Sequence, residues 1–146
     1  GKKIISIVKK LVKNKIPVMG HLGILPQTDK KFTFKGKKTL ERNRILKEAK
    51  LLEAAGIFSI VLECIEIKLS KMITNKLTIP TIGIGSSANC DGQVLVIDDL
   101  IGLSESKFRF VKKYVNMSKI INGAVRQYKL EVLRKQFPKS KHSFKN

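Results

Sequence analysis

The sequence has no tryptophan, only two cysteines and no long apolar run. Cys64 and Cys90 are too few and too irregularly placed for a disulfide framework or a zinc motif, so we expect ordinary buried thiols. The longest apolar runs, such as residues 57–62, are far shorter than the ~20 residues that span a bilayer. The first residues also lack the apolar core of a signal peptide. We therefore expect a cytoplasmic protein with no membrane partner.

Acidic residues are scarce as well, since 11 Asp and Glu stand against 30 Lys and Arg and the net charge is +19. A balance of this kind is compatible with a nucleic-acid-binding module. However, 25 of the 30 cations are lysines, they are scattered along the chain, and the bidentate grip on phosphates and bases is made mainly by arginine. We expect a solvated lysine-rich surface and no nucleic-acid partner, with a basic binding module as the alternative.

A chain of 146 residues has the length of one domain, and we expect residues 1–146 to form one. Short runs of mostly apolar, branched residues predict four buried strands, near 16–20, 57–64, 79–84 and 93–97. Helical patterns alternate with them, at residues 3–14, 40–55, 66–75, 107–117 and 118–137. Thr39 is a candidate N-cap, Gly56 a candidate C-terminal cap, and residues 138–146 are expected to fray.

Apolar strands that alternate with helices indicate parallel βαβ units. Four units do not close a barrel, because the usual barrel has eight strands. The pattern therefore fits either an open four-stranded sheet or half of an eight-stranded barrel.

Polar residues gather directly after the predicted strands, where parallel α/β folds build their sites. Glu63 ends an apolar strand, and burial of a carboxylate raises its pKa towards the range of a catalytic base. A Glu in that position can equally bond backbone amides or a lysine. His21 stands between Gly20 and Gly23, and small neighbours allow a ligand or a backbone to approach closely. It can also be a structural histidine.

Three other segments have weaker signals. Residues 83–86 (GIGS) are able to hold an anion with backbone amides, or to serve only close packing. Asp98 and Asp99 suit either a metal site or helix capping. Asp91 and Gly92 form a dipeptide that is typical of a turn.

Several collinear segments resemble the ketopantoate hydroxymethyltransferase family. Residues 17–27 (PVMGHLGILPQ) are similar to its PVMGHIGLTPQ segment, and residues 53–56 with 60–64 (EAAG, IVLEC) to its EEAG and IVLEC motifs. Residues 79–85 (IPTIGIG), 90–96 (CDGQVLV) and 99–103 (DLIGL) continue the match, and residues 137–144 echo its FPxxEHSF ending. The matches extend along nearly the whole chain.

The resemblance implies an α/β fold, the C-terminal half of a (β/α)8 TIM barrel of the phosphoenolpyruvate/pyruvate type, with four parallel strands and C-terminal helices. It implies transfer of a hydroxymethyl group from 5,10-methylenetetrahydrofolate to 3-methyl-2-oxobutanoate, giving ketopantoate for coenzyme A synthesis. The resemblance also implies a Mg2+ cofactor and a homo-oligomer, which is a decamer in the family. Glu63 matches the family's proton acceptor, and His21 its substrate-binding histidine.

Three departures limit what the resemblance implies. The family chain is nearly twice as long, and its metal ligands precede the matched segment, so we expect no metal ligand in this chain and a missing N-terminal half as its partner. Residues 27–36 form a shorter loop than in the family. Ser86 to Asn89 replace its AGxD, and Asp98 replaces a His or Asn. An inactive relic of the enzyme is therefore the alternative to an active half.

Overall fold

The computed structural model of the chain describes residues 4–26 and 33–144. The chain divides into two compact units, Gly1–Val94 and Leu95–Asn146. The single domain predicted for residues 1–146 stays a prediction.

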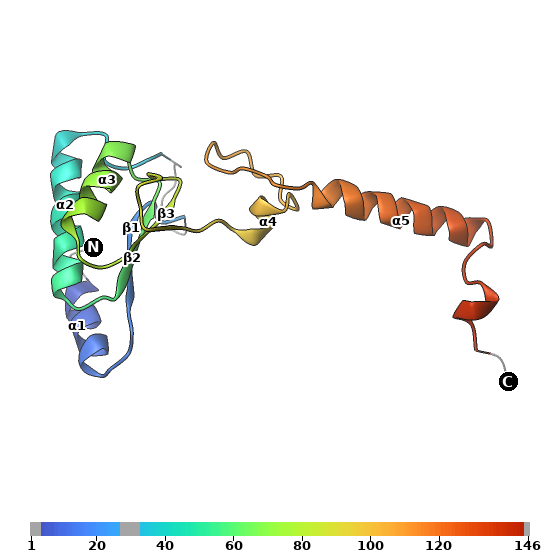
Figure 1. Cartoon of the computed structure of the whole chain (residues 1–146), viewed down its shortest axis with the longest axis horizontal. Helices are drawn as coiled ribbons and strands as arrows, with labels where there is room; N and C mark the ends of the chain where they lie inside the picture. Colours follow the sequence, from blue (N-terminus) through green and yellow to red (C-terminus); the bar gives the residue numbers. More distant parts are fainter. Residues whose placement is uncertain (1–3, 27–32, 145–146) are drawn as a thin grey trace. The chain divides into compact units, whose positions relative to one another are not determined.

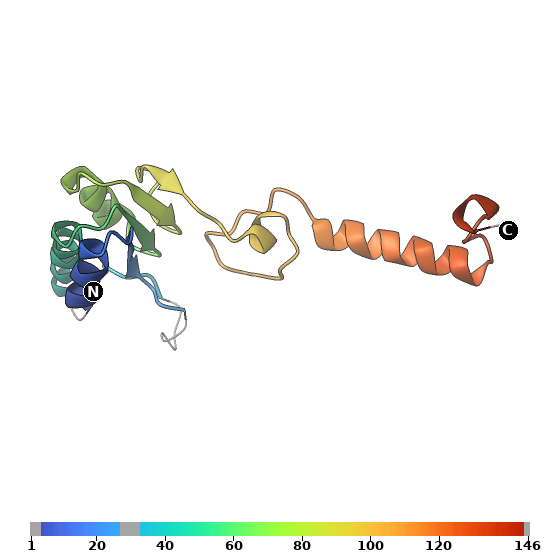
Figure 2. The same ribbon diagram turned by 90° about the horizontal axis from the view of Figure 1, so that it is seen from below.

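The first unit contains a parallel sheet of four strands in the order β1-β2-β3-β4. The strands are β1 (Met19–Gly23), β2 (Ser59–Glu63), β3 (Thr81–Ile84) and β4 (Gly92–Gln93). Figure 2 shows these strands side by side, pointing the same way. In the register, Gly23 lies opposite Glu63, and Glu63 opposite Ile84. The carboxyl ends of the first three strands therefore lie side by side, at what we call the carboxyl end of the sheet.

Three helices cover one face of this sheet: α1 (Ile5–Lys13), α2 (Thr39–Ala54) and α3 (Ile67–Lys76), as Figure 1 shows. Side chains alternate between the two faces of a strand. Ile60 and Leu62 of β2 consequently point to the helices and are fully buried, together with Leu52 of α2 and Ile73 of α3. The four predicted parallel strands and the helices between them are confirmed, and they fit half of a (β/α)8 barrel.

The element ends differ from the predictions at several places. β1 starts three residues later than expected, after Pro17, which has no backbone N–H to donate to a strand ladder. Thr39 is the first residue of α2 and not its N-cap. Lys38, which has an extended backbone, occupies the N-cap position, and its side chain makes no capping bond. Gly56 does take the left-handed conformation expected of a helix end, with φ of 92°. β4 covers only Gly92 and Gln93, so the strand predicted at 93–97 is wrong after its first residue, and Ile97 already begins a helix.

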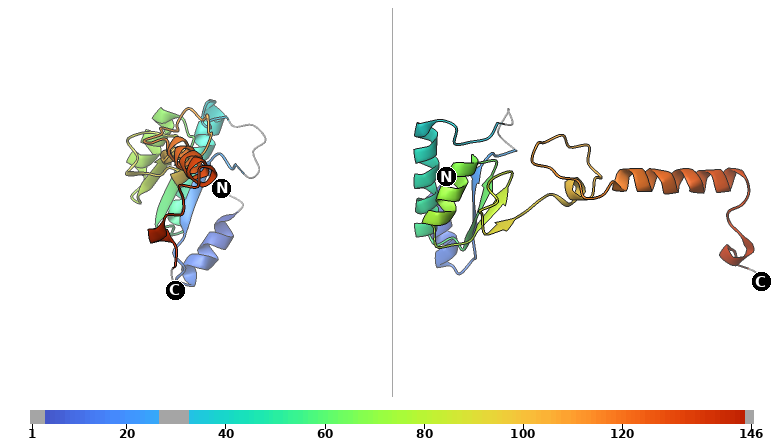
Figure 3. Two further views of the ribbon diagram at one scale, coloured as in Figure 1. Left: turned by 90° about the vertical axis from the view of Figure 1, so that its right-hand side faces the viewer. Right: turned by 45° about the horizontal axis from the view of Figure 1, so that its top comes forward.

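The second unit contains α4 (Ile97–Leu100), α5 (Met117–Leu133) and the 3-10 turn η2 (Ser140–His142). The predicted helix over 107–117 is wrong. Residues 107–116 form no helix: the amide of Val111 donates to the carbonyl of Phe108 at 3.0 Å and closes a single turn, in which the rings of Phe108 and Phe110 stack at 5.7 Å. After α5 the chain turns back (Figure 3), and Phe137 meets Tyr128 edge-on at 5.4 Å and His142 at 5.3 Å.

No helix within the described ranges is both long enough and apolar enough to cross a membrane.

Candidate functional site

His21 and Glu63 meet at the carboxyl end of the sheet. They occupy the alternate positions of β1 and β2 that point away from the helices, since Leu22 and Leu62 point towards them. Nε2 of His21 is 3.0 Å from Oε2 of Glu63. The side chains keep 31% and 17% of their exposure, so both can be reached from outside. A carboxylate held by an imidazole at an accessible strand end has the geometry of a proton-transfer pair.

Gly23 allows the two strands to bring these side chains together. Its φ is 125°, which disfavours any other residue, and a Cβ there would overlap the carbonyl oxygen of Glu63. The amide of Ile24 then donates to that same carbonyl at 3.1 Å. The close approach expected from the glycines around His21 is therefore made by the backbone of Glu63.

The chain turns sharply just after Glu63. Cys64 has a left-handed φ of 50°, and its amide donates to the carbonyl of Ile84 at 2.8 Å. The hydroxyl of Ser86 donates to the carbonyl of Leu62 at 2.7 Å and accepts the amide of Ile65 at 3.1 Å. This hydroxyl thus bridges the residues on both sides of Glu63 and Cys64, a role that the sequence did not reveal.

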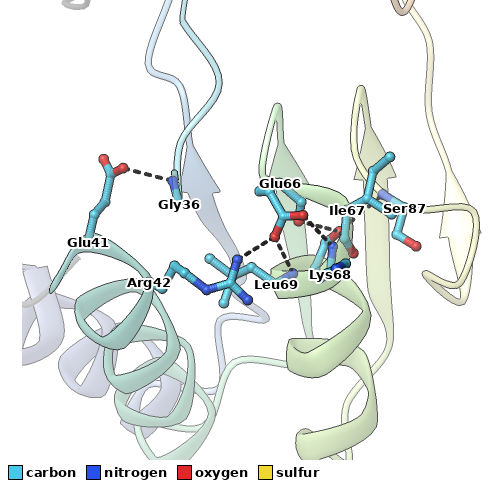
Figure 4. Close-up of polar contacts among 9 residues, drawn as sticks. Gly36, Glu41, Arg42, Glu66, Ile67, Lys68, Leu69 and Ser87 are labelled. Atoms are coloured by element: carbon cyan, nitrogen blue, oxygen red, sulfur yellow. Dashed lines mark hydrogen bonds and ion pairs between the residues drawn. The ribbon is translucent and has the colours of Figure 1, made fainter. Parts of the chain in front are cut away.

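Glu66 forms a second anchor behind the turn, shown in Figure 4. Its carboxylate accepts the amides of Lys68 and Leu69 at the start of α3, at 3.0 and 2.9 Å, and Arg42 of α2 at 2.5 Å. Burial acts to raise the pKa of Glu66, but these bonds outweigh it and lower the pKa below the usual value. Sequence reasoning missed this pair. The available signal was a Glu directly before a predicted helix, and it is weak because Glu is not one of the residue types preferred at the N-cap.

The turn predicted at Asp91 and Gly92 has a further role. Oδ2 of Asp91 accepts both the amide and the hydroxyl of Thr81 at 2.8 Å, which ties β4 to the start of β3. These bonds to Thr81 lower the pKa of the carboxyl group. The GIGS segment favours the packing interpretation, since a Cβ at Gly83 would meet the side chains of Gln93 and Cys90.

Asp98 and Asp99 lie in the first turn of α4, where the carbonyl of Asp98 accepts two amides and the side chain of Asp99 accepts the hydroxyl of Ser104. Within residues 4–26 and 33–144, no three His, Cys, Asp or Glu side chains converge as a metal site would require. Cys64 and Cys90 are free and buried, as expected, and burial followed by the charge of Glu63 raises the pKa of Cys64 to about 11.

The shortened loop predicted at residues 27–36 falls largely outside the described residues. Its last part is described. The amide of Lys35 donates to the carbonyl of Cys64 at 2.8 Å, and Glu41 accepts the amide of Gly36 at 2.8 Å (Figure 4). The end of the loop is therefore attached to the turn that follows Glu63.

Comparison with known proteins gives one consistent family. The family model for ketopantoate hydroxymethyltransferase matches residues 1–140. A protein of Pelagibacter ubique named 3-methyl-2-oxobutanoate hydroxymethyltransferase is 60% identical over 144 residues, covering 99% of this chain and 56% of that protein. A protein of the same name in Syntrophus aciditrophicus is 48% identical, over 99% of this chain and 54% of that protein. Another in Saccharolobus solfataricus is 46% identical, over 97% of this chain and 54% of that protein. The chain spans about half the length of the curated relatives it matches.

Proposed function

The chain belongs to the ketopantoate hydroxymethyltransferase family, and on that basis we propose that the whole protein transfers a hydroxymethyl group to 3-methyl-2-oxobutanoate. The one-carbon donor is 5,10-methylenetetrahydrofolate and the product is ketopantoate, a precursor of coenzyme A. The observation that supports this proposal is the 3.0 Å contact between His21 and Glu63 at the carboxyl end of the sheet.

Glu63 acts as the base in this proposal. Its carboxylate takes the proton from C3 of the keto acid, and the electron pair of that C–H bond forms an enolate. C3 then attacks the methylene carbon of the folate, and one C–N bond of the methylene bridge breaks as the C–C bond forms. Water displaces the second nitrogen, which leaves a hydroxymethyl group on C3 and releases tetrahydrofolate. A positioned base of this kind contributes about 10²- to 10⁴-fold to the rate.

His21 contacts the substrate and orients the base. Because Nε2 faces Oε2 of Glu63, the imidazole limits where the carboxylate can point and can donate a hydrogen bond to it. The exposed part of the ring is available to a substrate oxygen. The pair thus combines proton removal with substrate orientation.

A magnesium ion belongs to the proposed reaction, and it would stabilise the oxygen charge of an enolate. The described residues do not provide a site for it, since no third ligand-type side chain joins His21 and Glu63. We propose that the metal ligands lie in the remainder of the whole protein, in an N-terminal half that completes the barrel. We also propose that the whole protein is cytoplasmic and forms a homo-oligomer, a decamer as in the family.

The test is hydrogen exchange at C3 of the keto acid, followed by NMR in deuterated water with the whole protein. Glu63→Gln should lower the exchange rate by at least about 10²-fold while circular dichroism stays unchanged. Glu105→Gln removes the same charge at an exposed position and should leave the rate unaltered. Unchanged exchange in the Glu63 variant would exclude it as the base. No exchange in the unmodified whole protein would support the inactive relic instead.

A further inference from the structure

One hydroxyl group holds the backbone on both sides of the proposed base. Three consecutive peptide groups surround Glu63: they join Leu62 to Glu63, Glu63 to Cys64, and Cys64 to Ile65. The hydroxyl of Ser86 donates to the carbonyl of the first group at 2.7 Å and accepts the amide of the third at 3.1 Å. A serine hydroxyl has a single proton to donate, so this side chain uses its donor on one outer peptide group and an acceptor position on the other.

The middle peptide group is held by backbone on either side of β2. The carbonyl of Glu63 accepts the amide of Ile24 at 3.1 Å, and the amide of Cys64 donates to the carbonyl of Ile84 at 2.8 Å. The Cα atom of Glu63 lies between this group and the first group, which Ser86 holds. Because peptide groups are planar, the orientations of these two groups set φ and ψ of Glu63 and the direction in which its side chain leaves the strand. Ser86 therefore takes part in aiming the carboxylate.

The turn after Glu63 is strained and depends on its partners. Cys64 has a φ of 50°, a conformation that residues with a Cβ rarely adopt and that persists only where the surroundings hold it. The third peptide group is held at both ends, because the amide of Lys35 donates to the carbonyl of Cys64 at 2.8 Å and the hydroxyl of Ser86 accepts the amide of Ile65. Without the bond to Ser86 we expect the turn to relax towards an ordinary φ and to move Glu63 with it.

The loop that presents Ser86 is itself anchored on both sides. Gly85 before it has a left-handed φ of 61°, and the amide of Ser87 after it donates to the hydroxyl of Ser70 in α3 at 3.1 Å. Ser87 keeps only 2% of its exposure. The hydroxyl of Ser86 thus comes from a segment that is fixed against α3, and a fixed group can in turn fix the backbone that it binds.

From these contacts we propose that Ser86 is a positioning residue for Glu63. This inference rests on the proposed function. The hydroxyl bonds backbone groups and not the carboxylate, so it acts on the reaction through the direction in which the carboxylate points. A displacement of a reacting group by about 1 Å can cost about 10²-fold in rate, whereas His21, the proposed substrate contact, lies on β1 and keeps its place. Loss of the hydroxyl should therefore lower kcat and leave KM for the keto acid nearly unchanged.

The experiment measures C3 hydrogen exchange of the keto acid with the whole protein, at several keto-acid concentrations, so that kcat and KM are obtained separately. Ser86→Ala removes both hydroxyl bonds and should lower kcat about tenfold while KM changes by less than about twofold. Ser86→Thr keeps a hydroxyl that can donate and accept, and it should restore kcat to within about twofold of the unmodified protein. A kcat that returns with the hydroxyl identifies positioning of the base, because loss of packing alone would not be reversed in this way.

The matched control is Ser87→Ala, because the hydroxyl of Ser87 bonds Asn89, two residues later in its own turn. This variant should keep a normal kcat, and urea unfolding of all three variants reports any loss of stability. Unchanged exchange in Ser86→Ala, or a Thr variant as slow as the Ala variant, would overturn the positioning role alone. Equal losses of kcat in Ser86→Ala and Ser87→Ala would also overturn it, because they would indicate a general loosening of the loop. Absence of exchange in the unmodified whole protein would overturn the proposed function, and this inference with it.

Discussion

At the scale of single residues, glycines decide where the backbone can come close. Gly23 has a left-handed φ and lies directly against the carbonyl of Glu63, whereas Gly123 in α5 has nothing within 4 Å of the place where a Cβ would stand. The same residue type is therefore indispensable at one position and unnecessary at the other.

Gly23→Ala should destabilise the protein by more than about 3 kcal/mol, because the new methyl group overlaps backbone and not a movable side chain. Gly123→Ala is the control and should stabilise α5 by about 0.5–1 kcal/mol, since alanine is the better helix former. Urea unfolding of the whole protein measures both. A Gly23 variant with unaltered stability would contradict the close contact.

Asp91 gives stability that depends on pH. Hydrogen bonds from Thr81 lower its pKa in the folded state, so its contribution is present above the unfolded pKa of about 3.9 and is lost as the pH falls through the folded value. Asp91→Asn should cost about 1 kcal/mol at pH 7, a figure that allows for the exposure of the carboxylate. The cost should shrink when unfolding is measured below about pH 3. An equal cost at both pH values would mean that the charge has no part in it.

At the scale of elements, the start of α3 is stabilised from its neighbour α2. Glu66 caps two amides of α3 while Arg42 reaches it from α2, so one carboxylate connects two helices behind the turn after Glu63. A capping side chain contributes about 1 kcal/mol, and a partly exposed ion pair such as this one, with 27% and 25% of its side chains exposed, adds less than that.

Glu66→Ala should therefore lower the unfolding free energy of the whole protein by roughly 1–2 kcal/mol. Arg42→Gln should cost less, because it leaves the cap bonds to Lys68 and Leu69 in place. Thermal unfolding of both variants ranks the two contributions. A larger loss from the Arg42 change would show that the ion pair, and not the cap, stabilises this helix start.

At the scale of the whole molecule, the described units leave apolar surface that a complete barrel would cover. Met19, on the face of the sheet opposite α1, α2 and α3, keeps 48% of its exposure, and no residue of α5 is buried. β1 and β4 are the edges of the sheet, and open edges pair readily with other strands.

Residues 1–146 produced alone should consequently self-associate or precipitate. Co-production with the remainder of the whole protein as a separate chain should yield a soluble complex. Size-exclusion chromatography with light scattering distinguishes these states. A sharp monomer of 16.4 kDa at high concentration would contradict the expectation.

Much of the fold could be predicted from the sequence by itself. Apolar strands alternating with helices predicted the parallel sheet, because both faces of such strands are buried in α/β folds. The motifs around His21 and Glu63 predicted the family. The first and last residues of helices and strands were harder to predict from the sequence. They depend on local backbone geometry, as at Pro17, at Lys38 and around the stacked rings of Phe108 and Phe110, and composition does not show that geometry.

Only the tertiary structure decided which polar side chains act together. His21 and Glu63 are 42 residues apart, and the strand register brings them to 3.0 Å. The same holds for Arg42 with Glu66, for Asp91 with Thr81, and for the hydroxyl of Ser86 around Glu63. In the first unit the sequence determined whether the main segments form helices or strands, because periodicity and branching are local properties, whereas the helix predicted over 107–117 in the second unit is absent. The pairing of side chains depends on register and packing between distant segments, which no local pattern specifies.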